Sequence, residues 1–184
     1  YQYVRVKRGK TVVKMSKRAG NFISAREVLE EVGKDAFRFW LLRFAPQTHM
    51  DFDLELLKLQ SSKNPVYYVQ YAHARITSIL QKVKLKKNFS RLAGSRIAGK
   101  LLKEKEELNL IKKLAEFPEV LEEISKNYEV HYLPRYVLEL AKTFHNFYEK
   151  QRVITEDGNL TAARLSLISA AKIVLANALN LLGI

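Results

Sequence analysis

"NPVYYVQYAHARITSIL", residues 64–80, carries the strongest structural signal in this sequence. Asn64 can cap a helix, and Pro65 suits the first helical position, where its missing backbone N–H would have no partner in any case. Apolar positions then recur at helical spacing, at Tyr68, Ala72, Ile76, Ile79 and Val83. The stretch therefore predicts a helix from Pro65 to about Lys84 that buries one face in a core.

The chain beyond this helix continues in the same pattern. Helical periodicity and prolines near the starts indicate helices at roughly 101–116, 118–127, 134–152 and 161–182. The third has an apolar stripe made of Val137, Leu140, Ala141, Phe144 and Phe147, and the last is apolar over most of its surface. Residues 86–100 are basic and rich in small side chains, which indicates a loop. From Asp51 onward the expected architecture is an all-α bundle.

The first fifty residues are organised differently. In residues 1–13, "YQYVRVKRGKTVV", apolar and basic residues alternate on both sides of Gly9-Lys10, which predicts a short β-hairpin. Ser24 stands three residues before Glu27, a capping box that starts a helix running to Gly33, and a second helix follows up to Pro46. The sequence thus predicts a mainly α protein, with a hairpin and loop in residues 1–50 and a helical bundle in residues 51–184.

The charge of the chain points to its class of partner. Its 184 residues carry 32 Lys and Arg against 19 Asp and Glu, a formal net charge of +13. A surplus of this size favours a polyanion, with nucleic acid the first candidate. The alternative is a solvated Lys/Glu surface of the kind found in heat-adapted proteins.

Several other classes of protein are disfavoured. The chain has no cysteine, which excludes disulfides, thiolate catalysis and cysteine-based zinc sites. The four histidines have no metal-ligand spacing on one helical face, so we expect no metal site. No apolar run reaches the length of a membrane span and no signal peptide opens the chain, so we expect a cytoplasmic protein with no membrane partner.

Two helices carry candidate RNA-binding side chains. Tyr71 and its neighbours lie off the apolar stripe of their helix, and aromatic rings beside cations suit unpaired RNA bases. In the helix at 134–152, Tyr148 and Arg152 are one turn apart, so that a ring and a cation could hold a splayed base. The alternatives are that the tyrosines are half-buried packing residues and that Arg152 complements the helix C-terminus.

The loop "VVKMSKRAGN", residues 12–21, is cationic and holds no carboxylate. Both Lys14 and Lys17 can reach a phosphate chain, and Ser16 can add a hydrogen bond. An ammonium that meets phosphates mainly in the transition state would stabilise the developing negative charge. The plain alternative is a solvated basic turn, since Lys-x-x-Lys-Arg is a common pattern.

Longer stretches around these motifs resemble a known family. Residues 13–43, "VKMSKRAGNFISAREVLEEVGKDAFRFWLLR", resemble the signature-loop region of class I aminoacyl-tRNA synthetases. Residues 50–80, "MDFDLELLKLQSSKNPVYYVQYAHARITSIL", and residues 160–184, "LTAARLSLISAAKIVLANALNLLGI", are similar to the arginyl-tRNA synthetase family in particular. The resemblance covers nearly the whole chain and is least specific over residues 85–130.

This resemblance implies roles for named residues. The family's Lys-Met-Ser-Lys-Ser type loop binds ATP phosphates, and it is matched by Lys14, Met15, Ser16 and Lys17, with Arg18 in place of the final serine. The resemblance assigns transition-state stabilisation to the second lysine, Lys17. It implies that the helical bundle binds the tRNA anticodon, through positions that correspond to Tyr68, Tyr71, Tyr148 and Arg152.

The resemblance also implies a parent enzyme that joins arginine to its tRNA with ATP and magnesium. The family's nucleotide-binding fold and its His-Ile-Gly-His type signature are missing from this sequence. We therefore expect a C-terminal portion that is inactive alone and holds no cofactor of its own. Two other readings remain: a free-standing helical RNA-binding module without catalysis, and a helical protein-interaction domain whose charge serves solubility.

Overall fold

A small sheet opens the chain, as seen in the computed structural model, which describes residues 3–13, 15, 22–84 and 98–184. Its strands are β1 (Val4–Arg8), β2 (Thr11–Val12) and β3 (Met50–Asp53), in the order β2-β1-β3. The predicted hairpin is confirmed, because β1 and β2 are antiparallel and Gly9 turns between them with a φ of +59°. That left-handed conformation costs least for glycine.

β3 corrects the expectation that the chain is helical from Asp51. It lies parallel to β1, with Val4 opposite Met50 and Val6 opposite Phe52. Met50 and Phe52 are buried, whereas Asp51 and Asp53 are only partly buried. This alternation has the period of two expected for a half-buried strand. Helix begins only after Asp53, whose Oδ1 accepts hydrogen bonds from the first turn of α3 (Leu54–Lys58) at 3.1 and 3.2 Å.

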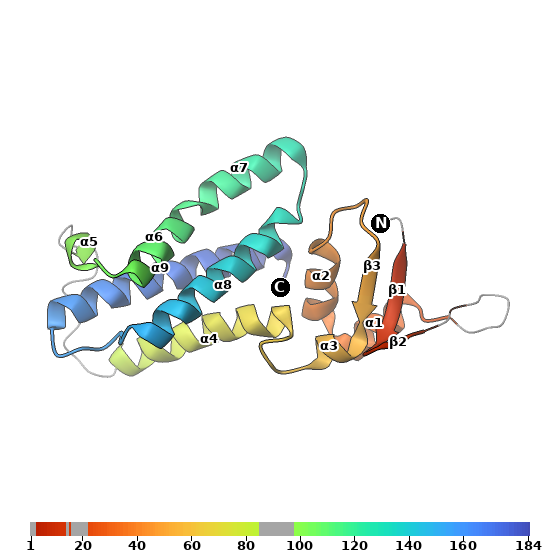
Figure 1. Cartoon of the computed structure of the whole chain (residues 1–184), viewed down its shortest axis with the longest axis horizontal. Coiled ribbons are helices and arrows are strands. Elements are labelled where there is room, and N and C mark those ends of the chain that lie inside the picture. The colour runs from red at the N-terminus through yellow and green to blue at the C-terminus, as the bar shows by residue number, and fades with distance from the viewer. Residues whose placement is uncertain (1–2, 14, 16–21, 85–97) are drawn as a thin grey trace.

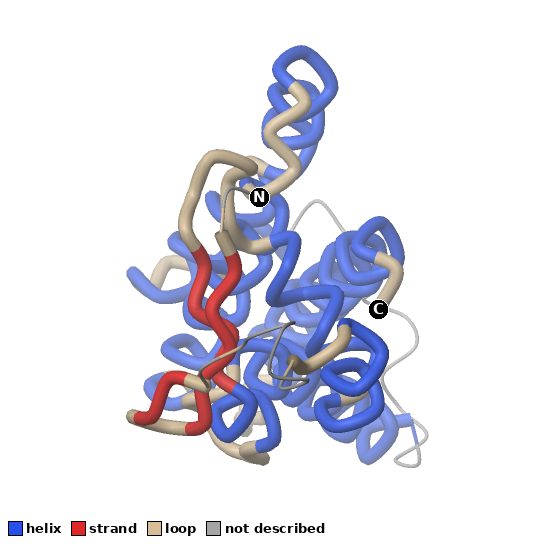
Figure 2. The backbone as a smooth tube through the Cα atoms, turned by 90° about the vertical axis from the view of Figure 1, so that its right-hand side faces the viewer, coloured by secondary structure: helices blue, strands red, loops and turns tan. Residues whose placement is uncertain are grey.

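Two helices lie beside the sheet (Figure 2), α1 (Ala25–Val32) and α2 (Lys34–Leu42). The predicted capping box is present: the Ser24 backbone N–H donates to Glu27 Oε2 at 2.6 Å, and the Glu27 N–H donates to Ser24 Oγ at 3.2 Å. α2 ends before Pro46 and is tied to β3 by a 2.9 Å hydrogen bond from Trp40 Nε1 to the Asp51 carbonyl. We call residues 3–58 the entry layer.

The remaining helices form a bundle (Figure 1). They are α4 (Pro65–Lys84), α5 (Ala98–Leu101), α6 (Lys105–Ala115), α7 (Phe117–Asn127), α8 (Tyr132–Lys150) and α9 (Gly158–Leu182). The predicted fold class, a mainly α chain with a short N-terminal β element, is confirmed. Several boundaries differ from the prediction: α8 ends at Lys150 rather than Arg152, residues 98–100 are helical where a loop was expected, and the helix expected from residue 101 begins at Lys105, after a short break that follows α5. Residues 86–97 of that expected loop lie outside the described residues.

The core of the bundle lies along the helix faces that the spacing of apolar residues predicted. The stripe Val137, Leu140, Ala141, Phe144 and Phe147 on α8 is fully buried. On α4, Ala72, Ile76 and Val83 are buried, whereas Tyr68 and Ile79 are partly exposed at the edge of the core. α9 contacts α4, α5, α6 and α8, and its inward face supplies Ile168, Ala171, Leu175 and Ala178.

α9 also corrects the expectation that no apolar run reaches the length of a membrane span. It has 25 residues, and its most apolar window has a mean hydropathy of 1.7, so length and composition alone would allow it to cross a membrane. Core helices meet the same criteria. α9 contacts four other helices of the bundle, and 39% of this window is buried in the structure.

The entry layer is tied to the end of α9. α2 contacts both α4 and α9, and Arg38 Nε donates a hydrogen bond to the Leu182 carbonyl. Gly183 has a φ of +73°, and the Arg38 guanidinium lies over it so closely that a Cβ at this position would clash. The C-terminal end of α9 therefore lies directly against α2, the second helix after the cationic loop.

Candidate nucleic-acid interface

Three side chains on α4 form a ladder along one side of the helix. Tyr67, Tyr71 and Arg75 follow one another at one-turn intervals. The two tyrosine rings are nearly parallel, with centroids 5.9 Å apart and an interplanar angle of 8°. The Arg75 Cζ atom lies 4.6 Å from the centre of the Tyr71 ring and 4.8 Å from that of Tyr148 on α8. The guanidinium is thus held between rings from two helices.

Arg75 is a cation without a counter-charge among the described residues. Its Nη2 donates to the Tyr71 hydroxyl at 2.7 Å, and its Nη1 lies 3.4 Å from His145 Nδ1, but no carboxylate pairs with it. Tyr71 is 41% exposed and Tyr148 is 37% exposed. A positive charge between accessible π faces suits the bases and phosphates of an unpaired nucleic acid.

The rings of Tyr68 and His145 pack against this site on the side that faces the core. Tyr68 lies half-buried against the core, and its ring centroid is 4.7 Å from that of His145. Burial raises the pKa of Tyr68. The pKa of His145 is lowered, mainly by burial and to a smaller extent by the positive charge of Arg75. Both side chains are therefore neutral near pH 7. We call Tyr68, Tyr71, Arg75, His145 and Tyr148 the tyrosine–arginine cluster.

The cluster differs from the predicted set in three residues, because it lacks Arg152 and contains Arg75 and His145. Three candidates, Tyr68, Tyr71 and Tyr148, lie together, but Arg152 is not on the same helix turn because α8 has already ended. The cation over Tyr148 comes from Arg75 instead. Arg75 was not selected as a site residue, although its spacing of four from Tyr71 was a usable signal. Its place opposite Tyr148 depends on how α4 packs against α8, which spacing does not show.

Arg152 lies at the rim of a neighbouring hollow of about 480 Å³ at the ends of α4 and α8. Lys82 and Tyr148 also line this hollow, and the Arg152 and Lys82 side chains are exposed. The Arg152 backbone is held from the interior, because its carbonyl accepts a 2.7 Å hydrogen bond from Arg164 Nη1. Arg152 is therefore placed to extend the basic surface beside the cluster.

A buried ion pair fixes the turn that carries Arg152. Arg164 Nε donates to Glu107 Oε1 at 2.7 Å, and Arg164 Nη2 donates to Gln151 Oε1 at 3.0 Å. The Arg164 residue is 6% exposed and Glu107 is 0% exposed. One guanidinium thus joins α6, α9 and the segment after α8, and a shift of that segment would leave guanidinium N–H donors without their acceptors.

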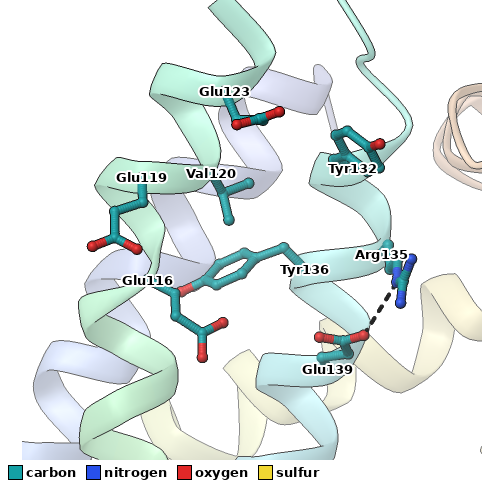
Figure 3. A pocket seen from close by; sticks show the side chains of 8 residues that line it. All are labelled: Glu116, Glu119, Val120, Glu123, Tyr132, Arg135, Tyr136 and Glu139. Carbon is teal, nitrogen blue, oxygen red and sulfur yellow. Dashed lines mark hydrogen bonds and ion pairs between the residues drawn. The ribbon is translucent and has the colours of Figure 1, made fainter.

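An acidic cleft of about 450 Å³ lies between α7 and α8 (Figure 3). Its lining includes four glutamates, namely Glu116, Glu119, Glu123 and Glu139. Tyr132 and Tyr136 form the aromatic part of the wall, and Arg135 Nε donates to Glu139 Oε1 at 3.3 Å. Its carboxylates would repel phosphates, so this cleft does not suit a nucleic acid.

The cationic loop lies largely outside the described residues. Of the five loop candidates only Met15 is described, with its side chain exposed, whereas Lys14, Ser16, Lys17 and Arg18 are not. Glu31 of α1 connects the end of β1 to α3. It accepts hydrogen bonds from Arg8 Nη2 at 2.8 Å and from Lys58 Nζ at 3.0 Å. These two cations lower the pKa of Glu31 to about 2.

Within the described part of the chain, no group of three or more histidine, aspartate or glutamate side chains could hold a metal ion.

Comparison with known proteins gives two family matches along the chain. Residues 69–184 match the family model of the DALR anticodon binding domain. Residues 3–55 match the model of class I tRNA synthetases (I, L, M and V). The second match ends beside β3 and the first begins within α4, so together they include most of the entry layer and all of the tyrosine–arginine cluster except Tyr68.

Individual relatives agree with these matches. The chain is 51% identical over its whole length to an arginine–tRNA ligase of Dehalococcoides mccartyi, of which it covers 32%. A solved structure from Campylobacter jejuni, described as an arginyl-tRNA synthetase, superposes with a TM-score of 0.81 at 31% identity over 98% of this chain and 38% of that one. The Thermus thermophilus arginyl-tRNA synthetase gives a TM-score of 0.68 at 28% identity, over 91% of this chain and 28% of that one.

The chain spans about a third of the length of the curated relatives it matches. The resemblance to arginyl-tRNA synthetases inferred from the sequence is confirmed over the full chain. Since the anticodon-binding model covers residues 69–184, more than half of the 184 residues, the chain belongs to the DALR anticodon binding domain family and carries a class I tRNA synthetase segment before it.

Proposed function

We propose that this chain is the part of an arginyl-tRNA synthetase that binds the anticodon of arginine tRNA and supplies a loop for the phosphates of ATP. The observation that carries the first half is the unpaired Arg75 between Tyr71 and Tyr148, within the region that matches an anticodon-binding family. Rings and a free cation on one surface can stack unpaired bases and attract the backbone at once.

Affinity and selectivity come from different groups on this surface. The exposed cations, including Lys82 and Arg152, contact phosphates and supply most of the affinity without sequence preference. Tyr71, Arg75 and Tyr148 stack the anticodon bases and supply the preference, while the half-buried Tyr68 supports them from below. The acidic cleft lies outside the contact area.

The experiment compares two RNA hairpins that differ only in the anticodon. The 184-residue chain is titrated with the anticodon stem-loop of arginine tRNA and with the same stem-loop carrying an unrelated anticodon, at several salt concentrations. We expect tighter binding of the first and a steep salt dependence for both. Equal affinities would refute anticodon recognition, and binding without salt dependence would refute the phosphate contacts.

The second half of the proposal concerns the loop. We assign residues 1–50 to the end of the catalytic domain, with the signature loop and helices that contact the tRNA stem, and residues 51–184 to the α-helical anticodon-binding domain. In the complete enzyme, which joins arginine to tRNA in the cytoplasm, Lys14, Met15, Ser16, Lys17 and Arg18 contact the phosphates of ATP bound with magnesium. The Lys17 ammonium stabilises the charge that develops as pyrophosphate leaves. The chain by itself does not activate arginine, because one cation cannot position both substrates.

Lys17→Ala in the complete synthetase tests this role. It should slow formation of arginyl-adenylate by ~10²–10³ and affect ATP binding less, because the contact is made mainly in the transition state. Lys10→Ala, at the exposed hairpin turn, is the matched control and should leave the rate unchanged. If the two variants react at the same rate, the loop is a basic turn without a catalytic role. ATP–pyrophosphate exchange by the 184-residue chain alone would contradict its predicted inactivity.

The alternative is an RNA-binding module that has no catalytic partner in any context. It predicts the same stem-loop binding but no effect of Lys17 on any activation reaction, so the same pair of lysine variants separates the two readings.

A further inference from the structure

His145 is the most buried residue of the tyrosine–arginine cluster. Only 6% of it is exposed, and its ring contacts those of Tyr68, Tyr71 and Phe144, at centroid distances of 4.7, 5.9 and 5.4 Å. It comes from α8, whereas the Arg75 guanidinium that it faces comes from α4. The imidazole is therefore part of the packing that fixes where the guanidinium lies.

Packing alone does not require an imidazole at this position. The His145 Nε2 atom is enclosed and makes no hydrogen bond of good geometry, although the Tyr68 backbone lies near enough to favour the protonated ring. An apolar side chain of similar volume would fill the space without enclosing an unpaired polar atom. The polar atom that does have a neighbour is Nδ1, 3.4 Å from Arg75 Nη1.

The chemistry of this contact depends on protonation. Arginine offers only N–H donors, so Nδ1 must present a lone pair, which requires the neutral ring with its proton on Nε2. A protonated ring would have donors at both nitrogens and a positive charge against the guanidinium. The contact between His145 and Arg75 can therefore exist in only one of the two ionisation states of the histidine.

The surroundings favour the neutral state near pH 7. Burial and then the charge of Arg75 lower the pKa of His145, and the Tyr68 backbone and the Glu149 carboxylate oppose them. The facing ionisable groups are Arg75, Tyr68 and Tyr71 from α4, with Glu149 and Tyr148 from α8. Among the described residues, α6, α7 and α9, which also pack against α8, supply no charged group that acts on this pKa. The ring therefore becomes charged at a lower pH than an unperturbed histidine.

We propose that His145 is a positioning residue for anticodon recognition: its neutral ring accepts a hydrogen bond from Arg75 and keeps the guanidinium between Tyr71 and Tyr148. Protonation of the ring releases Arg75 and weakens the anticodon preference. The proposal rests on the proposed function, because it assigns a role in the same site. The direction of this pH effect separates the proposal from a general effect of charge. An added positive charge by itself should strengthen phosphate binding and so tighten the binding of every RNA, whereas the proposal predicts a loss of anticodon preference.

Three variants separate positioning from packing. His145→Asn places an acceptor oxygen near the position of Nδ1 and cannot titrate. His145→Leu keeps the volume and removes the acceptor. His73→Asn makes the same change at another histidine of the α4 surface, which makes no contact with Arg75 among those described, and serves as the control. Melting temperatures of all three variants show whether each is folded.

The readout is the ratio of the affinities for the two stem-loops at constant salt, from about pH 7.5 to about pH 4.5, a range that extends below the ordinary titration of histidine because the pKa of His145 is lowered. We expect the ratio to fall about five- to tenfold in the wild type and in His73→Asn, in step with a loss of about one stacking contact. His145→Asn should keep a high ratio at every pH, and His145→Leu a low one. A wild-type ratio in folded His145→Leu, or a remaining pH dependence in His145→Asn, would overturn the proposal.

A measurement without RNA completes the test. ¹⁵N NMR of the imidazole should show the proton of neutral His145 on Nε2 in the wild-type chain, and a proton on Nδ1 would overturn the proposal. If the wild type shows no anticodon preference at any pH, the proposed function fails and this role falls with it. If the wild type has the preference and His145→Leu retains it, only the role of His145 is wrong.

Discussion

α4 and α7 lie on either side of α8 (Figure 1), and each of these two flanks holds tyrosines and an arginine, Arg75 of α4 on one and Arg135 of α8 itself on the other. Toward α4, Arg75 lies between Tyr71 and Tyr148 with no carboxylate partner among the described residues. Toward α7, Arg135 pairs with Glu139 at 3.3 Å in a cleft lined by three more glutamates (Figure 3). The partner of the arginine, rather than the presence of rings and cations, decides which flank suits a nucleic acid.

The tyrosines of the two flanks differ in the same way. Tyr136 is buried and its hydroxyl donates to the Lys113 carbonyl at 2.8 Å, so it belongs to the packing of α6 and α8. Burial raises its pKa. Tyr71 is exposed, and its hydroxyl accepts from Arg75. The net charge of +13 is therefore not spread evenly over these two flanks, and of the two the α4 flank, with its exposed rings and cations without a described carboxylate partner, suits a polyanion better.

The largest expected effect is on stability and comes from the arginine behind the cluster. Arg164→Ala leaves Glu107 buried and unpaired, and should lower the free energy of unfolding by about 3–5 kcal/mol. Arg135→Ala removes the exposed arginine of the acidic cleft and should cost less than about 1 kcal/mol. Urea unfolding at neutral pH measures both. Equal losses would mean that the buried pair does not hold the turn after α8.

A smaller effect should separate charge from stacking at the cluster. Arg75→Lys keeps the positive charge but loses the planar group that lies against two rings. It should reduce the preference for the arginine anticodon by about 1 kcal/mol and leave the salt dependence unchanged. Arg135→Lys, on the other flank, is the control. If both variants keep the wild-type preference, the guanidinium between the rings contributes only its charge.

The smallest expected effect concerns a single phosphate contact. Lys82 is exposed beside the cluster and makes no ion pair among those described. Lys82→Ala should weaken all RNA hairpins alike and reduce the salt slope by about one unit. Lys126→Ala, which removes an exposed lysine from α7, should change neither quantity. A change in anticodon preference with Lys82→Ala would show that affinity and selectivity are not separable on this surface.

The sequence predicted the helices well because their signals are local. Ser24 and Glu27 form the predicted capping box, and Asn64 Oδ1 caps α4 by accepting from the Val66 N–H at 3.1 Å. β3 was missed because its pairing partner β1 lies more than forty residues earlier, and "MDFD" is too short to show a strand pattern by itself.

The candidate site was predicted only in part, for a similar reason. Tyr71 and Tyr148 were identified, but Arg152 was paired with Tyr148 on the assumption that α8 continues. Arg164, from α9, binds the carbonyl of Arg152 instead, and the helix ends two residues earlier. Arg75 comes from α4 and His145 from α8, so their meeting depends on tertiary packing that spacing within one helix does not reveal.

The most direct test of anticodon recognition by the α4 flank compares single tyrosines on the two flanks. The ratio of affinities for the arginine stem-loop and for the stem-loop with an unrelated anticodon is measured for Tyr71→Ala, Tyr148→Ala and, from the acidic cleft, Tyr132→Ala. Losing a stacked base should lower the ratio by ~1–3 kcal/mol in the first two variants, with the salt slope unchanged, while Tyr132→Ala keeps the wild-type ratio. A wild-type ratio in both Tyr71→Ala and Tyr148→Ala would show that these tyrosines are packing residues and that the anticodon is read elsewhere.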